Sequence, residues 1–430
     1  MNDSSNSSSR NLAISAPSLN VSGANDRIAV AVVGLGIAIG QNHLVGLHER
    51  AEENNIAVAA ACDVYEKRRA EAIKHANLAN SNVYLDYRRI LDRKDIDAIL
   101  IATHDPLHAQ ISLDALDAGK HVYCERPMTR HLGEAFSVYD KVKRSRKVFQ
   151  LGVQGCSSGA WRKCAELLES GKVGKLVWSQ GWYSRNGGPM CDGYLMVDKD
   201  SSESTVDWNK WLGPLKKRPF NATHFHQWRV YSDYSAGLLA SNAPQPLHVI
   251  MLASGHPEFP SCVSCVASHH LRKNDPYRSP DPRQLPAHLQ ILAEFPDGHT
   301  MALTCSWLNA TTPGVKFYCR KATLAVNNAE DLIEINPEGE FRSEVRPETF
   351  EGLGQIDARR HEKNWFDCIR SGKSPNADIE LAIRAQVVLS LAEISNLRKT
   401  TCLFDPATRK ITDGTGREIT PPGYDSSGSI

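Results

Sequence analysis

The sequence predicts an α/β fold in two parts: an N-terminal doubly wound parallel sheet, then a C-terminal α/β domain with a largely antiparallel open sheet. Apolar, strand-like runs alternate with helical stretches between residues 27 and 153, as in proteins with a parallel sheet. A glycine turn follows the first of these runs. Beyond residue 262, four strand-like runs follow one another without a helix between them, which is typical of antiparallel strands.

The composition is that of a globular protein that binds neither nucleic acid nor a membrane. The chain has 430 residues, enough for two domains, and its 41% hydrophobic and 23% charged residues are ordinary proportions. The net charge is +1, and no apolar run reaches the roughly 18 residues that span a bilayer.

The 11 cysteines are scattered along the chain and odd in number. Cys262 and Cys265 are separated by two residues that predict a strand, so their side chains would face opposite sides of it. No set of His, Cys, Asp and Glu has the spacing of metal ligands. We expect buried free thiols in a reducing compartment, and no metal site.

The segment RIAVAVVGLGIAIG, residues 27–40, predicts a nucleotide-binding entrance. Its apolar run Ile28–Val33 is typical of a strand buried on both faces. Gly34, Gly36 and Gly40 follow in a GxGxxxG pattern, one residue longer than the usual turn, just before a helical stretch. Such a turn lets the backbone and the positive end of the helix approach a pyrophosphate.

A second apolar run, Ile56–Cys62, ends in Asp63. An acidic side chain at the end of the second strand is placed to accept hydrogen bonds from ribose hydroxyls. Asp63 also favours NAD over NADP because it would repel a 2′-phosphate, although Lys67, Arg68 and Arg69 nearby oppose this preference.

The other elements follow from the same patterns. In the first part we expect strands at Val83–Leu85, Ala98–Ala102, His121–Cys124 and Val148–Val153, with helices including Leu107–Ala118 and Gly133–Arg146. In the second part we expect a linking helix at Gly159–Gly171, a strand at Lys175–Ser184, and a long segment, 187–235, rich in Gly, Pro, Trp and His that covers something. A helix at Leu238–Ala253, interrupted by prolines, strands at Cys262–His269, His288–Phe295, Thr300–Asn309 and Val315–Val326, an edge strand at Asp331–Ile335 and helices at Asp357–Arg370 and Asp378–Leu397 complete the prediction.

Residues 1–26 are rich in Ser and Asn and predict a disordered arm. The arm has neither twin arginines nor an apolar region, so it does not form a working export signal as it stands. We expect a cytoplasmic protein, with a periplasmic one as the alternative if the arm is the remnant of such a signal.

Several separate motifs together resemble the Gfo/Idh/MocA oxidoreductases. They are the glycine turn, the strand DAILIAT, His108 downstream of it, the run AGKHVYCERP and the C-terminal run HEKNWFDCIRSGKSPNADIELA. The segment DWNKWLGP with KRPFN is similar to a branch of that family common in soil bacteria. The resemblance covers roughly residues 27–400.

The resemblance implies a Rossmann domain over residues 27–153 and a substrate and oligomerisation domain over 154–400, with a C-terminal extension at 401–430. It also implies an NAD(P)-dependent reaction at a hydroxyl or keto carbon of a sugar or cyclitol, and a homo-oligomer formed through the C-terminal sheet. The cofactor-binding residues that it implies are Gly34, Gly36, Gly40, Asp63, Thr103, His108, Glu125, Arg126, Pro127 and Gln154.

Three positions depart from the family pattern. Arg126 replaces the lysine of the family's EKP motif, and Ser241 and Gln245 replace the aspartate and histidine of its second signature. Arginine stays protonated at ordinary pH, and a glutamine amide has no useful basicity. Both usual proton carriers are therefore absent.

We predict a catalytic set of Arg126, His248 and Gln245, in which Arg126 orients a ligand oxygen and His248 is the first candidate for the base. His104, His224 and His226 are the other candidates, and each of these histidines has a structural role as its alternative.

The substrate-binding residues that we predict are Tyr183, Arg185 and His226; for the first two, sheet packing and a solvated charge are equally good interpretations. Trp208, Trp211 and Trp228 either stack on a sugar or pack in a core. His361, Asn364 and Asp367 share one face of a predicted helix, as a polar site or as surface contacts.

Two classes of function remain open at this point. The first is an oxidoreductase on a carbohydrate-like substrate, with an NAD-dependent glycosidase as a variant of the enzyme. The second is a nucleotide-binding protein of the same fold that has lost catalysis, as the three substitutions at the catalytic positions would allow.

Overall fold

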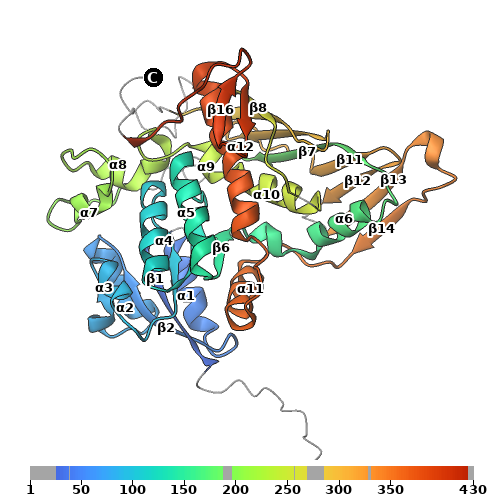
Figure 1. Cartoon of the computed structure of the whole chain (residues 1–430). Coiled ribbons are helices and arrows are strands. Elements are labelled where there is room, and N and C mark those ends of the chain that lie inside the picture. The colour runs from blue at the N-terminus through green and yellow to red at the C-terminus, as the bar shows by residue number, and fades with distance from the viewer. Residues whose placement is uncertain are drawn as a thin grey trace, which may run out of the picture.

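A computed structural model gives the structure of the chain and describes residues 26–37, 39–186, 196–255, 257–268, 285–327 and 331–424. Residues 1–25 of the predicted arm at 1–26, part of the long segment (187–195), His269 and the end of the tail (425–430) lie outside the described residues. In Figure 1 the N-terminal domain (blue to teal) lies below a large second sheet.

The N-terminal domain is built on a six-stranded parallel sheet with the order β3-β2-β1-β4-β5-β6. Its strands are β1 (Ile28–Val33), β2 (Ile56–Cys62), β3 (Val83–Tyr84), β4 (Ala98–Ile101), β5 (His121–Glu125) and β6 (Phe149–Gly152). All five neighbouring pairs are parallel, which confirms the doubly wound sheet. The strand order reverses between β1 and β4, where sheets of this kind bind their ligands.

Helices cover both faces of this sheet: α1 (Gly40–Glu49), α2 (Glu66–His75), α3 (Arg88–Leu91), α4 (His108–Asp117) and α5 (Leu132–Ser145). The side chains of β1 alternate between two hydrophobic cores. Val30 and Val32 pack in the core that holds Leu44 and Leu47 of α1. Ala31 and its neighbour on the same face pack in the other core, which explains the unbroken apolar run.

A helix from the far end of the sequence completes the N-terminal domain. α11 (Ala358–Ser371) places Trp365 and Phe366 in the same core as Val30. The amide nitrogen of Gln150 in β6 donates to the His361 carbonyl at 2.7 Å. The core of the first domain is therefore closed by residues that lie some two hundred positions downstream in the chain.

The second sheet has ten strands with the order β14-β13-β12-β11-β7-β10-β9-β8-β15-β16. They are β7 (Leu176–Ser184), β8 (Cys262–Ser268), β9 (His288–Glu294), β10 (Thr300–Ser306), β11 (Val315–Cys319), β12 (Ala322–Asn327), β13 (Leu332–Pro337), β14 (Glu348–Glu351), β15 (Cys402–Asp405) and β16 (Lys410–Asp413). Only β7 and β10 pair in parallel, so the prediction of a largely antiparallel sheet is confirmed.

Three details of this sheet differ from the prediction. The run Val315–Val326 is a hairpin of two strands rather than one strand, because the chain reverses at Arg320 and Lys321, where no Gly or Pro marks a turn. β13 is not an edge strand, since β14 pairs on its outer side. Residues 402–413 form β15 and β16 and so belong to the sheet rather than to a separate extension.

Among the described residues, helices cover one face of the second sheet and none covers the other. α6 (Gly159–Glu169), α9 (Leu238–Ser241), α10 (Pro244–Ala253) and α12 (Ile379–Arg398) pack on or beside the inner face. Pro244 stands in the first turn of α10, and the predicted helix Leu238–Ala253 is indeed divided there. On the outer face Val266 is 74% and Leu292 60% exposed.

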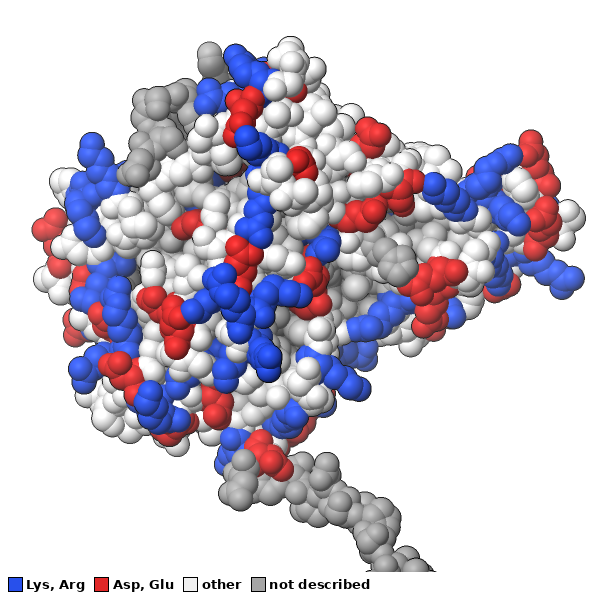
Figure 2. Space-filling view, viewed as in Figure 1, with Lys and Arg blue, Asp and Glu red and all other residues white. Residues whose placement is uncertain are grey.

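The ten described cysteines are all unpaired, and nine of them are buried. Cys262 and Cys265 form no disulfide, as predicted. Among the described residues no group of His, Cys, Asp and Glu could hold a metal ion. None of the described helices is long and apolar enough to cross a membrane. Acidic and basic side chains are interspersed over the face in Figure 2, in line with the net charge of +1.

Candidate active site

The glycine turn joins β1 to α1 as predicted. A Cβ atom on Gly34, whose φ is +88°, would lie 2.6 Å from the Ala102 carbonyl carbon, so this glycine allows β1 and β4 to approach. A Cβ atom on Gly40 would collide with the carbonyl oxygen of Gly34. A Cβ atom on Gly36 meets nothing within 4 Å. Gly36 therefore borders open space, as the backbone of a pyrophosphate cradle must.

Asp63 fastens the second strand to this turn. Its carboxylate accepts hydrogen bonds from the backbone N–H groups of Leu35, at 2.7 Å, and Tyr65, at 2.8 Å. The guanidinium of Arg68 lies 3.7 Å away. Each carboxylate oxygen keeps further lone pairs, so Asp63 can also accept the ribose hydroxyls.

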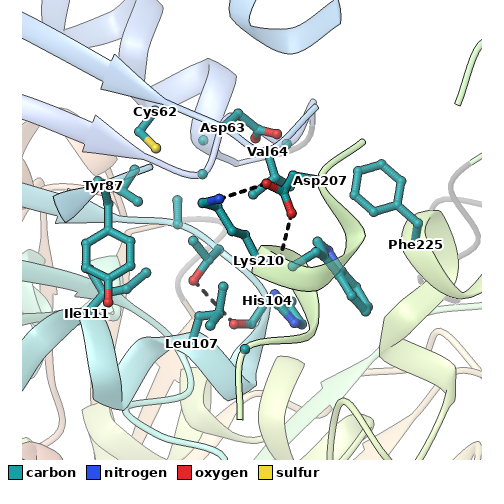
Figure 3. Close-up of a pocket in the computed structure, with 18 of the residues that line it drawn as sticks. Cys62, Asp63, Val64, Tyr87, His104, Leu107, Ile111, Asp207, Lys210 and Phe225 are labelled. Carbon is teal, nitrogen blue, oxygen red and sulfur yellow. Dashed lines mark hydrogen bonds and ion pairs between the residues drawn. The ribbon is translucent and has the colours of Figure 1, made fainter. Parts of the chain in front are cut away.

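A cavity of about 610 Å³ opens beside the turn (Figure 3). Gly34, Gly36, Gly40, Asp63 and Thr103, five of the ten predicted cofactor residues, line it. Its other walls include Tyr87 and Ile111 at the left of Figure 3 and Phe225 at the right. The volume is in the range of small-molecule and cofactor sites.

Residues 198–231, which we call the covering segment, close one side of this cavity. They contain α7 (Trp208–Leu212) and α8 (Ala222–Gln227). The segment is fixed to the loop after β2: Val206 bridges to Tyr65, and Lys67 forms an ion pair with Asp198 at 2.8 Å. The prediction that this part of the long segment is ordered and covers something is confirmed.

The aromatic residues of the covering segment pack against the end of β4. The ring of His104 stacks on Trp211 with centroids 4.1 Å apart and an angle of 6° between the planes. Trp208 in turn stacks on Trp211, with ring centroids 4.5 Å apart. Trp211 and Trp228 line the cavity, whereas Trp208 is buried in the aromatic core behind it.

His104 lines the cavity and is only 4% exposed. Its Nε2 atom is buried and has no hydrogen-bond partner in the described part of the chain. Burial, reinforced by the charges of His108 and Arg229, lowers the pKa of His104 well below 6.5. The imidazole is therefore neutral near pH 7, with a nitrogen that the protein itself does not use.

Glu125 lies in a buried network at the end of β5. Its Oε1 lies 2.9 Å from His43 Nε2 and 3.0 Å from Gln154 Nε2, and His43 Nδ1 lies 2.7 Å from Glu362. Burial disfavours both charged forms, but the hydrogen bonds and opposite charges outweigh it. They raise the pKa of His43 to about 9 and lower the pKa of Glu125 to about 2.

Arg126 is engaged by its own chain. It donates to the Glu125 carboxylate at 3.1 Å and to the Ser241 carbonyl at 3.2 Å. With its amide oxygen turned toward the guanidinium, Gln245 also accepts from Arg126 at 3.2 Å. Neither Arg126 nor Gln245 is among the residues that line the cavity. Their predicted roles in catalysis stay predictions.

The four candidate histidines have different surroundings. His248 is 1% exposed, bonds the Pro244 carbonyl through Nδ1 at 2.7 Å, and does not line the cavity. Burial lowers its pKa to about 4. His226 lines the cavity, but its Nε2 lies 3.1 Å from the Ser201 hydroxyl. His224 Nδ1 lies 2.9 Å from the Tyr234 hydroxyl.

The remaining predicted residues lie around the site rather than in the cavity. His108 joins two loops through the Pro127 and Thr103 carbonyls, at 2.7 and 3.1 Å. At the end of β7 the Arg185 guanidinium lies over the ring of Tyr183, 5.2 Å from its centroid. His361 is buried and bonds the Ser157 hydroxyl and the Leu151 carbonyl; Asn364 and Asp367 contact their own neighbourhood, so this set is structural.

Sequence reasoning did not single out Arg229. This residue lines the cavity, and its guanidinium lies 4.2 Å above the ring of Trp228. The signal available was its place beside a tryptophan in the long aromatic segment, which by itself does not distinguish a ligand contact from a packed arginine.

Taken together, the glycine turn, Asp63 and the strand order define an NAD-binding Rossmann domain joined to a second, antiparallel domain. Residues 28–153 match the model of the Gfo/Idh/MocA oxidoreductase family, described as an NAD-binding Rossmann fold. This match spans the N-terminal domain, and over those residues it confirms the resemblance seen in the sequence.

Curated relatives match only part of the chain. Levoglucosan dehydrogenase of Pseudarthrobacter phenanthrenivorans is 34% identical over 26% of this chain and 29% of its own length. Inositol 2-dehydrogenase/D-chiro-inositol 3-dehydrogenase of Lactiplantibacillus plantarum is 25% identical over 51% of this chain and 57% of its own length. The sequence alignments therefore span less than two thirds of these relatives.

Solved structures match nearly the whole chain at low identity. A levoglucosan dehydrogenase in complex with NADH has a TM-score of 0.66 at 18% identity, over 91% of this chain and 100% of that one. An aldose-aldose oxidoreductase from Caulobacter crescentus complexed with glycerol has a TM-score of 0.65 at 16% identity, over 88% and 100%. These likenesses show that both domains share one fold with these enzymes.

Proposed function

We propose that this protein is an NAD-dependent oxidoreductase that acts on a hydroxyl or keto carbon of a sugar, cyclitol or related small molecule. The observation that carries the proposal is the cavity that joins the open face of Gly36, the Asp63 carboxylate and the covering segment. The names of the related dehydrogenases support a polyhydroxylated substrate.

The residues of the cavity fit the nucleotide. Gly36 leaves room for its phosphates, and Asp63 offers carboxylate oxygens to a ribose and disfavours a 2′-phosphate. The bound nicotinamide would exchange hydride with the substrate carbon. The protein must then orient that carbon and accept or return the hydroxyl proton.

We propose that His104, rather than His248, is the base that accepts the hydroxyl proton. A base must reach the proton that it abstracts; both histidines have a buried Nε2 without a partner among the described residues, but only His104 lines the cavity. Trp211 fixes the plane of the His104 ring by stacking. Arg126, held by Glu125, Ser241 and Gln245, positions the loop after β5 in this proposal.

Fluorescence titration with NADH and NADPH, followed by turnover of a panel of sugars and cyclitols, tests the function. We expect tighter binding of NADH and oxidation of at least one substrate by NAD⁺. Failure to bind either nucleotide would contradict the proposal outright.

The pH profile of oxidation tests the base. Since burial lowers the pKa of His104 well below 6.5, the wild-type rate should be flat above pH 6.5 and fall only at more acidic pH. His104→Phe keeps a ring against Trp211 but removes the nitrogen, so turnover should fall by about a hundredfold. His248→Gln is the matched variant; if it abolishes turnover instead, His248 is the base.

A second candidate function is nucleotide binding without turnover. It is favoured by the Arg126–Gln245 contact, because neither group at the family's usual catalytic positions can carry a proton. Tight NADH binding with no oxidation of any panel compound, and no cleavage of matched glycosides, would support this candidate over the enzyme.

We also propose that the protein is a homo-oligomer formed through the open face of the second sheet. The exposed Val266 and Leu292 lie on that face with Trp178 and Tyr318, whose rings stack 3.6 Å apart. A broad sheet face with exposed apolar side chains is typical of an association surface.

A further inference from the structure

Arg229 brings a positive charge into the cavity that the rest of the protein does not use. Its guanidinium lies 4.2 Å above the ring of Trp228, and it borders the cavity together with His104 and Thr103. Among the described residues, no hydrogen-bond acceptor contacts the guanidinium. Five N–H donors are thus available on one side of a rigid aromatic platform.

Arg229 lies near the end of β4, because it stacks over Trp228, whose ring centroid is 5.9 Å from that of His104. Burial lowers its pKa to about 10 and the charge of Arg126 lowers it further, while the carboxylates of Asp105 and Glu125 oppose this change. It remains protonated at neutral pH. Asp105 follows β4, and Glu125 and Arg126 stand at the end of β5.

This end of the site carries an excess of positive charge without a ligand. The carboxylates of Glu125 and Glu362 face three cations, namely Arg50, Arg126 and the protonated His43. Arg229 adds a further positive charge, which the nearby carboxylate of Asp105 partly offsets. An anionic group bound here would relieve the repulsion between Arg126 and Arg229 in a partly dry cavity, where charges interact more strongly than in water.

We propose that Arg229 binds a carboxylate of the substrate, so that the substrate is an acidic sugar such as a uronate rather than a neutral sugar. The inference rests on the proposed function, because it names the substrate class of the same site. A guanidinium can hold a carboxylate through two parallel hydrogen bonds, which selects the acid over the matching alcohol.

The cofactor's pyrophosphate is the other anion that could meet Arg229. The glycine turn already offers open backbone at Gly36 and the start of α1 to the phosphates. Arg229 comes instead from the covering segment and lies over Trp228, whose ring is 5.9 Å from that of His104 after β4. These positions favour the substrate as the source of the anion, and the experiment separates the two.

Isothermal titration of the NADH-saturated protein with D-glucuronate and D-galacturonate, each against D-glucose and D-galactose, measures the preference for acids. We expect wild type to bind at least one uronate tenfold or more tightly than its neutral partner. Arg229→Gln should abolish this preference, and Arg229→Lys should retain part of it. Arg342→Gln, which removes an exposed arginine outside the cavity, should change nothing.

Each negative result of this titration has a different interpretation. If wild type shows no preference for uronates, the proposal is wrong. If Arg229→Gln weakens NADH tenfold or more and leaves the sugar preference intact, Arg229 serves the pyrophosphate and the proposal is equally wrong. If wild type does not bind NADH at all, the proposed function itself fails before the substrate class is reached.

Discussion

Gly34 and Gly36 stand two positions apart in one turn and are glycine for different reasons. Gly34 lies against the backbone of Ala102, directly after β4, whereas Gly36 faces the cavity. Gly36→Val should abolish NADH binding with the fold intact, since its side chain would fill space that only the phosphates need. Isothermal titration measures the affinity, and circular dichroism monitors the fold.

Gly34→Ala is the matched comparison for that variant. Its Cβ atom would press on the Ala102 carbonyl at φ +88°, so it should destabilise the domain even without nucleotide. Unchanged NADH affinity in a folded Gly36→Val protein would remove the pyrophosphate from this turn.

We expect the Asp63 carboxylate to accept hydrogen bonds from the adenosine ribose of the cofactor. Asp63→Ala should weaken NADH by about tenfold and NADPH less, since only NADH offers two free adenosine-ribose hydroxyls to the carboxylate. Asp63→Asn keeps an oxygen that can accept from Leu35 or Tyr65 and separates loss of the ribose contact from loosening of the turn. Equal losses for both nucleotides in titrations would contradict this role.

His43 holds two buried carboxylates, those of Glu125 and Glu362. His43→Ala leaves them facing each other with less positive charge and should cost about 3–5 kcal/mol in free energy of unfolding. His48→Ala, an exposed histidine on the same helix, should cost almost nothing. Chemical denaturation of the two variants beside wild type measures both effects.

The same pair predicts a pH dependence. The pKa of His43 is raised from 6.5 to about 9, so its stabilising charge is fully present below pH 6.5 and is lost as the pH rises through 9. The pKa of Glu125 is lowered from 4.5 to about 2, so its contribution is present above pH 4.5 and is lost as the pH falls through 2. Denaturation midpoints of wild type should therefore fall above pH 6.5, and His43→Ala should lack that decline.

At the scale of single residues, the sequence predicted the side chains that follow strand ends and missed those set by distant packing. Asp63 and Gly36 were predictable because a glycine turn and an acid after the second strand have local signatures. Arg229 and the Glu125–His43–Glu362 network were not, since their meaning depends on contacts between segments hundreds of residues apart.

At the scale of elements, Arg126 ties the end of β5 to α9 and α10 through Ser241 and Gln245. Arg126→Ala should reduce turnover or ligand affinity by about tenfold to a hundredfold, because hydrogen bonds to charged groups are worth roughly 1.5–3 kcal/mol. Arg126→Lys restores a proton carrier but loses the forked contact, so it should recover little while Ser241 and Gln245 remain. Steady-state kinetics measures the turnover of both variants. A wild-type rate in Arg126→Ala would contradict the proposed role of Arg126.

Element types were largely predictable and element partners were not. The alternation of apolar runs predicts the parallel sheet, and prolines predict the break between α9 and α10. The hairpin at Arg320 carries no turn residues, so its two strands read as one run. Nothing local tells that β15 joins β8, because antiparallel pairing between remote strands leaves no mark in either segment.

At the scale of the whole molecule, the open face of the second sheet predicts self-association. The double variant Val266→Asp, Leu292→Asp places two charges on that face and should convert an oligomer into a particle of 47.5 kDa. Leu397→Asp, at a site 40% exposed on α12, is the control and should leave the assembly unchanged. Light scattering after gel filtration gives the masses; a wild-type protein of 47.5 kDa would contradict the prediction.

The sequence divides the chain at residue 153, but the fold does not separate there. α11 supplies Trp365 and Phe366 to the first core, and Arg50, directly after α1, pairs with Glu362. A fragment that ends at 153 would lack these side chains, and its apolar core would be open to water.

The buried cysteines allow local unfolding of the chain to be measured by thiol alkylation. Burial raises the pKa of the Cys156, Cys164 and Cys305 thiols, and a thiol reacts with alkylating reagents only as its thiolate. Cys164 and Cys305 lie in the second domain and Cys124 in the first. Each domain therefore contains a buried free thiol that can be alkylated only when it becomes exposed. Mass spectrometry after timed alkylation would then show which half of the molecule exposes its interior first, and whether NADH delays that exposure.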